Sequence, residues 1–310
     1  MVMVSGGDSV TPFTANDAAC ASGLGAGMTL TQLRESFMAA GFRVFSAPVM
    51  NGRGPVVDPE PSSFGAFGGQ PQVLPAELTI NSVADIDLGG EHLARFLVWL
   101  AESHGAREIA LLGHSNGGLF ARSGLRVLRD TNADVRVRKL ITLGTPWLGA
   151  IPTRVALGEI DASVCGDDAF FASFLPAATA RIKEGDQGLA HTNTVVYVQG
   201  PNGWNAAQRG VLDHVDVLLI GGTYLRAERL GAAASGAAAV DPTIWPNDGI
   251  VPEFSALATD IDPGIVPNAT RASYPVTHSI FISHLLQLDW QTAMTWNSQV
   301  LVDAIDFASA

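Results

Sequence analysis

The sequence is poor in lysine and contains no long apolar run. Only two of its 18 basic residues are lysines, and its 30 acidic residues give a net charge of −12. Because phosphate binding needs clustered cations, this charge argues against a nucleic-acid partner, and two lysines form no basic membrane patch. No apolar stretch approaches the ~20 residues that span a bilayer, so we expect no transmembrane helix and no stable membrane insertion.

The chain also has only two cysteines, Cys20 and Cys165. Two are too few for a disulfide framework or a tetrahedral zinc site, so they form either one disulfide or two buried thiols. We also expect no cleavable signal peptide within this sequence, because residues 1–7 contain neither a basic segment nor a long apolar one. We therefore expect either a mature secreted protein, which the low charge favours, or a cytoplasmic protein.

Apolar residues, in contrast, are abundant. Hydrophobic residues make up 47% of the chain and charged residues 15%, which excludes an intrinsically disordered protein. The full length, 1–310, fits one large domain. Short apolar segments alternate with amphipathic ones, which predicts a mostly parallel sheet covered by helices on both faces. The expected strands are 2–4, 42–47, 108–112, 139–143, 194–199 and 271–276, and the main expected helices are 30–40, 82–104 and 117–129.

Two stretches interrupt this alternation. Residues 150–190 show no clear strand but contain an apolar cluster of Phe170, Phe171, Phe174 and Leu175. Residues 201–245 are irregular and include a low-complexity run of glycine, alanine and serine over 231–239. We interpret both stretches as insertions into the alternating domain.

The most informative segment is Gly113-His114-Ser115-Asn116-Gly117, which fits the pattern G-x-S-x-G between an apolar strand and a helix. Such a turn is sharp and strained, and it lifts the serine hydroxyl above the edge of the sheet. The flanking glycines are needed because a Cβ there would strike the neighbouring strand or helix. The serine then lies at a helix N-terminus, where N–H groups favour developing negative charge. The alternative is a glycine-rich turn with an idle serine.

Together with three further segments, this turn resembles the α/β-hydrolase superfamily, and within it the bacterial lipases and esterases. Residues 2–7, Val-Met-Val-Ser-Gly-Gly, look like the first-strand oxyanion segment, with Ser5 in place of the usual histidine. Residues 143–149, Leu-Gly-Thr-Pro-Trp-Leu-Gly, are similar to a lipase segment in which a histidine stands where this chain has Trp147. Residues 247–251, Asn-Asp-Gly-Ile-Val, look like the segment that carries the triad acid.

The resemblance implies an α/β-hydrolase fold, with a mostly parallel central sheet flanked by helices and a cap or lid insertion. It also implies a catalytic triad in the chain order serine, acid, histidine. Ser115 is then the nucleophile and Asp248 the acid, although an aspartate in such a turn is otherwise more often a turn former. The backbone N–H groups of Asn116 and Gly7 are expected to form the oxyanion hole.

The histidine of the triad must follow Asp248, and of the seven histidines only His278 and His284 do so. His278 lies two residues beyond the last expected strand, whose end should lie at the edge where catalytic groups collect on loops. His284 is six residues further, inside an apolar run. If that run is helical, His284 lies ~9 Å along it. We expect His278 to be the general base, with His284 as the alternative.

Residues and resemblance together imply hydrolysis of a lipid or another apolar acyl ester through an acyl-enzyme, without a cofactor. We expect residues 150–190 to form the cap and Trp147 to line the substrate pocket; the alternative for the cap cluster is an ordinary buried apolar patch. Two other classes of function use the same fold. One is an acyltransferase with the same triad, and the other is a catalytically inactive binding module.

The resemblance also bears on metals and on the cysteines. Family members that bind a structural calcium often have an aspartate two residues after the catalytic histidine, and Ile280 occupies that position here. We therefore expect no metal site. In this fold the segments that carry Cys20 and Cys165 both emerge above the site, so a disulfide between them would tie the insertion to the core.

Overall fold

The fold is built around a six-stranded sheet, seen in a computed structural model that describes residues 1–15, 26–57, 72–166, 168–184, 195–199, 203–230 and 241–310. The strand order is β2-β1-β5-β6-β7-β8, and every neighbouring pair is parallel. The strands are β1 (Val2–Val4), β2 (Phe45–Ser46), β5 (Glu108–His114), β6 (Arg136–Leu143), β7 (Asp216–Gly222) and β8 (Ala269–Tyr274). The expected mostly parallel sheet is confirmed.

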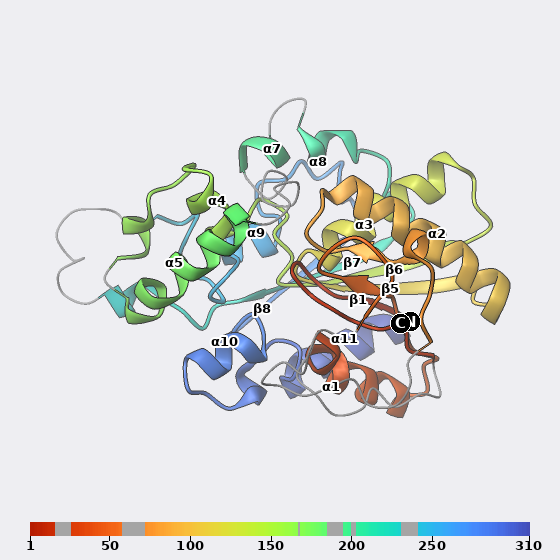
Figure 1. The fold of residues 1–310 in the computed structure, drawn as a ribbon, viewed down its shortest axis with the longest axis horizontal. Helices are drawn as coiled ribbons and strands as arrows, with labels where there is room; N and C mark the ends of the chain where they lie inside the picture. The colour runs from red at the N-terminus through yellow and green to blue at the C-terminus, as the bar shows by residue number, and fades with distance from the viewer. Residues whose placement is uncertain (16–25, 58–71, 167, 185–194, 200–202, 231–240) are drawn as a thin grey trace.

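Helices cover both faces of this sheet because alternate side chains of each strand point to opposite sides. Leu111 of β5 belongs to the core shared with α2 (Ile86–His104) and α3 (Gly117–Asp130). Its neighbour Leu112 belongs to the core shared with α1 (Ala26–Ala39) and α11 (Ser298–Ser309). Figure 1 shows these two helix pairs on opposite sides of the strands.

Shorter elements complete the described part of the chain. They are β3 (Val49–Met50), η1 (Ala76–Leu78), β4 (Ile80–Asn81), α4 (Ile151–Ala156), η2 (Ala162–Cys165), α5 (Ala169–Glu184), α7 (Val195–Gln199), α8 (Trp204–Ala207), η3 (Ala227–Leu230), α9 (Glu253–Ala256), α10 (Ile280–Leu285) and η5 (Trp290–Thr292). None of the described helices combines the length and the apolar character needed to cross a membrane.

The stretch that follows β6 forms a helical unit with its own small apolar core. In Figure 1, α4 and α5 lie to one side of the sheet, away from α2 and α3. Phe170, Phe171 and Leu175 of α5 are buried there together with Trp245. The apolar residues noticed in the sequence therefore do pack together, in a cluster that also includes Leu225 and Ile282.

The strand expected at 194–199 is wrong, because Val195–Gln199 is the helix α7. Its valines favour a strand, but tertiary packing overrides that preference. Tyr197 packs against a buried cluster that contains Leu119 and Trp204, and Val198 is fully buried.

The insertion expected over 201–245 is wrong in its middle part, where Asp216–Gly222 forms β7. This strand lies inside the sheet and pairs with β6 and β8. An interior parallel strand is buried on both faces, so its run of apolar residues shows no alternation that would mark it as a strand. The low-complexity run over 231–239 lies outside the described residues.

Helix α3, which follows Ser115, is held in place by its contact with α2. This contact depends on Gly90. A Cβ on Gly90 would lie 2.3 Å from the Cβ of Ser123 and 2.7 Å from its carbonyl carbon. In a helix, alanine is otherwise more stable than glycine by roughly 0.5–1 kcal/mol. Overpacking of a closed core costs ~1–3 kcal/mol, so the clash should outweigh the helix preference.

We predict that Gly90→Ala lowers the free energy of unfolding by about 1–2 kcal/mol, measured by urea denaturation. Gly52→Ala is the matched control and should leave stability nearly unchanged, because no atom lies within 4 Å of the added Cβ. A Gly90→Ala variant as stable as the parent protein would contradict the close approach of the two helices.

Candidate active site

Ser115 occupies the sharp turn between β5 and α3. Its φ of +55° lies in the left-handed region, which a residue with a Cβ adopts only under strain. A Cβ on Gly113 would lie 2.4 Å from the backbone nitrogen of Gly118, and one on Gly117 would lie 2.1 Å from the carbonyl oxygen of Val4. The two flanking glycines are therefore required by close approach of the backbone.

Backbone and side-chain hydrogen bonds hold Ser115 in this conformation. Its N–H donates to the carbonyl of Leu143 at 2.8 Å, and the hydroxyl of Thr145 donates to the Ser115 carbonyl at 2.8 Å. On its other side, Gly6 packs so closely that a Cβ there would lie 2.5 Å from the Cβ and 3.0 Å from the Oγ of Ser115. The side chain of Ser115 remains partly exposed, so a ligand can reach it.

Asp248 and His278 form a buried hydrogen-bonded pair. His278 Nδ1 lies 2.7 Å from Asp248 Oδ2, and the other carboxylate oxygen accepts the N–H groups of Ile250 and Val251 at 2.9 and 2.7 Å. The N–H of His278 also donates to the carbonyl of Asp248 at 2.8 Å. Because a carboxylate only accepts, Nδ1 carries the proton in this pair. A neutral His278 therefore has an unprotonated Nε2.

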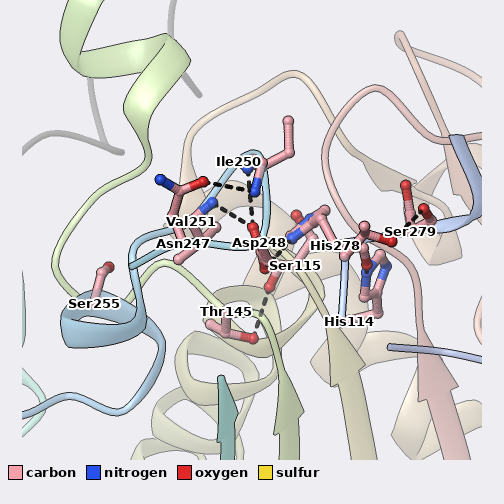
Figure 2. A network of polar contacts seen from close by, with 12 residues as sticks. His114, Ser115, Thr145, Asn247, Asp248, Ile250, Val251, Ser255, His278 and Ser279 are labelled. Atoms are coloured by element: carbon pink, nitrogen blue, oxygen red, sulfur yellow. Dashed lines mark hydrogen bonds and ion pairs between the residues drawn. The ribbon is translucent and has the colours of Figure 1, made fainter. Parts of the chain in front are cut away.

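Gly144 lies where the segments that carry Ser115, Asp248 and His278 come together. It follows β6 with a φ of +55°, and a Cβ there would lie 2.9 Å from both Asp248 Oδ2 and His278 Nδ1. Leu143, the residue before it, accepts the N–H of Ser115. Figure 2 shows Ser115, Asp248 and His278 gathered above the carboxyl ends of the strands. The structure thus brings the three expected triad residues to one place.

His114, the residue before Ser115, does more than fill space. Its ring is buried, and Nε2 donates a hydrogen bond to the carbonyl of His278 at 2.8 Å. The two imidazole rings lie 4.8 Å apart between centroids. Burial, assisted by the nearby His278, lowers the pKa of His114 to about 3, so its ring is neutral at physiological pH.

The other predicted site residues differ in their burial and in their place in the fold. Asn116, beside Ser115, is buried and is the N-cap of α3, and Gly7 directly follows Gly6. Trp147 is fully buried, and its indole N–H donates to the hydroxyl of Thr142, so it lies in the core and not on an open pocket wall. His284 is exposed in the last turn of α10.

Of the two cysteines, the structure describes Cys165 and not Cys20. Cys165 is buried in the small core next to α5, and burial raises the pKa of its thiol to about 12. Cys20 lies outside the described residues, so the disulfide stays a prediction. Among the described residues, no group of three or more His, Cys, Asp or Glu side chains could hold a metal ion.

Helix α5 contacts the loops on both sides of the site. The ring of Phe170, near its start, lies 3.5 Å from the position of a Cβ on Gly249, the residue after Asp248. Near its end, Arg181 forms an ion pair with Asp8, the residue after Gly7, at 3.0 Å. This helix therefore links the loop that carries the acid to the loop that follows β1.

Sequence reasoning assigned no role to Gly144 or Thr145, although it noted the segment that contains them. The only available signal was the Gly-Thr pair directly after an apolar strand. Its meaning depends on contacts with Asp248, His278 and Ser115, which lie far away in the chain.

Comparisons with known proteins agree with the architecture. Residues 76–160, which include the Ser115 turn, match a family model described as "Putative serine esterase (DUF676)". No curated protein sequence matches the chain. The chain is similar to the mature form of the Bacillus licheniformis lipase BlEst2, with 15% identity over 98% of this chain and 90% of that chain and a TM-score of 0.51. It is also similar to a Pyrobaculum calidifontis esterase, with 13% identity over 100% of this chain and 76% of that chain and a TM-score of 0.50.

These similarities confirm the fold class expected from the motifs. The chain has the α/β-hydrolase fold. At these identities the likeness extends to the fold alone, and the chemistry must be argued from the site.

The buried His114 should make stability depend on pH. Its pKa is about 3 in the folded protein against 6.5 for an unperturbed histidine. Below pH 6.5 the unfolded chain therefore binds a proton that the folded protein does not, and stability is lost as the pH falls from 6.5 towards 3. The slope from this group approaches ~1.4 kcal/mol per pH unit.

We predict that His114→Gln flattens the decline of unfolding free energy between pH 6.5 and pH 4, measured by urea denaturation at several pH values. His284→Gln, which alters an exposed ring, should keep the decline of the parent protein. Equal pH dependence in the parent protein and in His114→Gln would show that His114 is protonated in the folded state.

Proposed function

We propose that this protein is a serine carboxylic-ester hydrolase that cleaves apolar acyl esters through an acyl-enzyme intermediate. The observation that carries the proposal is the buried Asp248–His278 hydrogen bond, at 2.7 Å, held next to a serine in a strained turn. A strained backbone at the partly exposed Ser115 and a buried acid–histidine pair are both costly in free energy. Their occurrence together therefore favours a catalytic role.

The first half of the reaction forms the acyl-enzyme. His278 Nε2 takes the proton of the Ser115 hydroxyl while Oγ forms a bond to the ester carbonyl carbon. Asp248 keeps the His278 proton on Nδ1 and stabilises the imidazolium that results. The tetrahedral intermediate then collapses: its bond to the alkoxy oxygen breaks, and His278 gives its proton to the departing alcohol.

The second half regenerates the enzyme. His278 takes a proton from a water molecule, whose oxygen attacks the acyl carbon, and returns a proton to Ser115 as the carboxylic acid leaves. In both halves, the backbone N–H groups of Asn116 and Gly7 donate to the negative oxygen. The position of Asn116 as the N-cap of α3 supports this role, since the helix dipole favours negative charge there.

The surroundings of Asp248 support an apolar substrate. The residue after it, Gly249, is covered by Ile282 of α10, Phe170 of α5 and Leu225, whose side chains lie 2.7–3.6 Å from the position of a Cβ there. All three belong to one apolar cluster. An acyl chain that enters beside this loop would meet hydrocarbon side chains, so the insertion expected over residues 150–190 serves as a cap over an apolar substrate.

We predict that Ser115→Ala lowers kcat by roughly 10⁶-fold, because members of a triad act as a unit. The assay is release of p-nitrophenol from esters that range from two-carbon to long-chain acyl groups, with a melting curve to show that the variant folds. Ser309→Ala, at an exposed position on α11, is the matched control and should keep full activity. Turnover by Ser115→Ala near that of the parent protein would overturn the proposed function.

The choice of histidine is tested by a second pair of variants. His278→Ala should abolish turnover of a soluble ester, because it removes the only proton acceptor that Asp248 orients among the described residues. His284→Ala should retain most of the activity, since its side chain is exposed at the end of α10. The reverse result would transfer the role of general base to His284.

A further inference from the structure

We propose that His114 is a positioning residue that holds the main chain of His278 at a fixed distance from Ser115. The proposal rests on the proposed function, because it concerns the transfer of a proton between Ser115 and His278. It assigns a specific task to the variable residue that precedes the serine in the G-x-S-x-G turn.

The key contact links two segments that are far apart in the chain. His114 is the last residue of β5 and is covalently bonded to Ser115, yet its Nε2 lies 2.8 Å from the carbonyl oxygen of a residue 164 positions later, His278. Figure 2 shows His114 beneath His278, next to the serine turn. A single side chain thus connects the strand that carries the expected nucleophile to the loop that carries the expected base.

The other hydrogen bonds described for His278 do not make this connection. Its backbone N–H and its ring Nδ1 both donate to Asp248, at 2.8 and 2.7 Å. These two bonds fix His278 relative to the acid, but they allow the acid and the histidine to shift together relative to Ser115. The bond from His114 opposes that shift, because it attaches the carbonyl of His278 to the end of β5.

The protonation state of His114 suits this task. A carbonyl oxygen only accepts, so Nε2 of His114 carries a proton, and the low pKa keeps the ring neutral. A neutral ring 4.8 Å from the ring of His278 does not repel the imidazolium that forms when His278 takes the serine proton. His114 can therefore hold the base in place without opposing its charge.

The consequence is a specific effect on kcat. Proton transfer needs the donor and acceptor within hydrogen-bond reach, and a displacement of 1 Å can cost ~10²-fold in rate. Substrate binding depends on the cap and on the oxyanion donors, whereas the ring of His114 bonds to the carbonyl of His278 and lies against its ring. Loss of the hydrogen bond should therefore lower kcat and leave KM nearly unchanged.

The experiment compares substitutions that differ in their ability to reach the carbonyl of His278, each made in the full chain and assayed on a soluble p-nitrophenyl ester. Glutamine places its side-chain N–H close to the position of Nε2, whereas asparagine carries the same amide group one methylene short of it. We expect kcat to fall ~10²-fold in His114→Asn and His114→Leu. We expect His114→Gln to recover at least about tenfold of that loss, with KM within about twofold throughout.

A matched control removes a histidine-to-carbonyl hydrogen bond in another part of the fold. His92 on α2 has its Nδ1 2.5 Å from the carbonyl oxygen of Thr79, so His92→Leu loses a histidine-to-carbonyl contact away from the candidate site. It should keep the parent kcat. If His114→Leu does not fold, the Gln and Asn variants still decide the matter, because both keep a polar amide in the same buried position.

Two results would overturn the proposal. One is equal kcat in His114→Gln and His114→Asn, which would reduce His114 to a packing role. The other is a rise in KM without a fall in kcat. Either result, obtained while Ser115→Ala still abolishes turnover, would leave the proposed function intact, so the failure of the two proposals can be told apart.

Discussion

A buried carboxylate must be matched by donors, and the structure around the site is arranged to match the one on Asp248. This residue has none of its surface exposed, and its two oxygens accept from His278, Ile250 and Val251. Without them, burial of the charge would be too costly to maintain. The tight turn after Asp248 supplies two of the donors, and the loop after β8 supplies the third, so one carboxylate determines the course of two loops.

The Asp248–His278 pair has room at this edge of the sheet because glycines stand at the neighbouring strand ends. Gly144 after β6 and Gly222 at the end of β7 lie so close that a Cβ on either would fall within 3 Å of Asp248. Gly6 likewise leaves room for Ser115, because a Cβ on Gly6 would lie 2.5 Å from the Cβ of Ser115. A parallel sheet brings the carboxyl ends of its strands to one edge, and glycines let the polar residues there approach each other and the backbone.

A second buried charge stabilises the side of the site that faces α3. Arg122 is fully buried, and its guanidinium lies 3.8 Å from the centroid of the Trp147 ring and 4.7 Å from that of Trp204. It also donates to the side chain of Asn205 at 2.8 Å. Burial lowers the pKa of this guanidinium well below its usual range, and the two aromatic faces offset part of the desolvation. Trp147 therefore contributes to the core that supports the nucleophile turn.

Features that depend on residues close together in the chain are predictable from the sequence. Periodicity predicted the helices over α2 and α3, and alternation of apolar segments predicted a parallel sheet. The turn at Ser115 was predictable because the glycines, the serine and the flanking strand and helix all lie within about ten residues. The resemblance of residues 247–251 to the segment that carries the triad acid indicated Asp248, and chain order then left two histidines, of which the structure places His278 on the acid.

Features that depend on residues far apart in the chain become visible in the folded structure. It showed that residues 195–199 are helical and that Asp216–Gly222 is an interior strand, because neighbouring elements override local preference and burial on both faces removes alternation. It also placed Trp147 in the core and joined His114 to His278 across 164 residues. Spacing along the chain carries no information about such contacts, since they exist only once the strands are laid side by side.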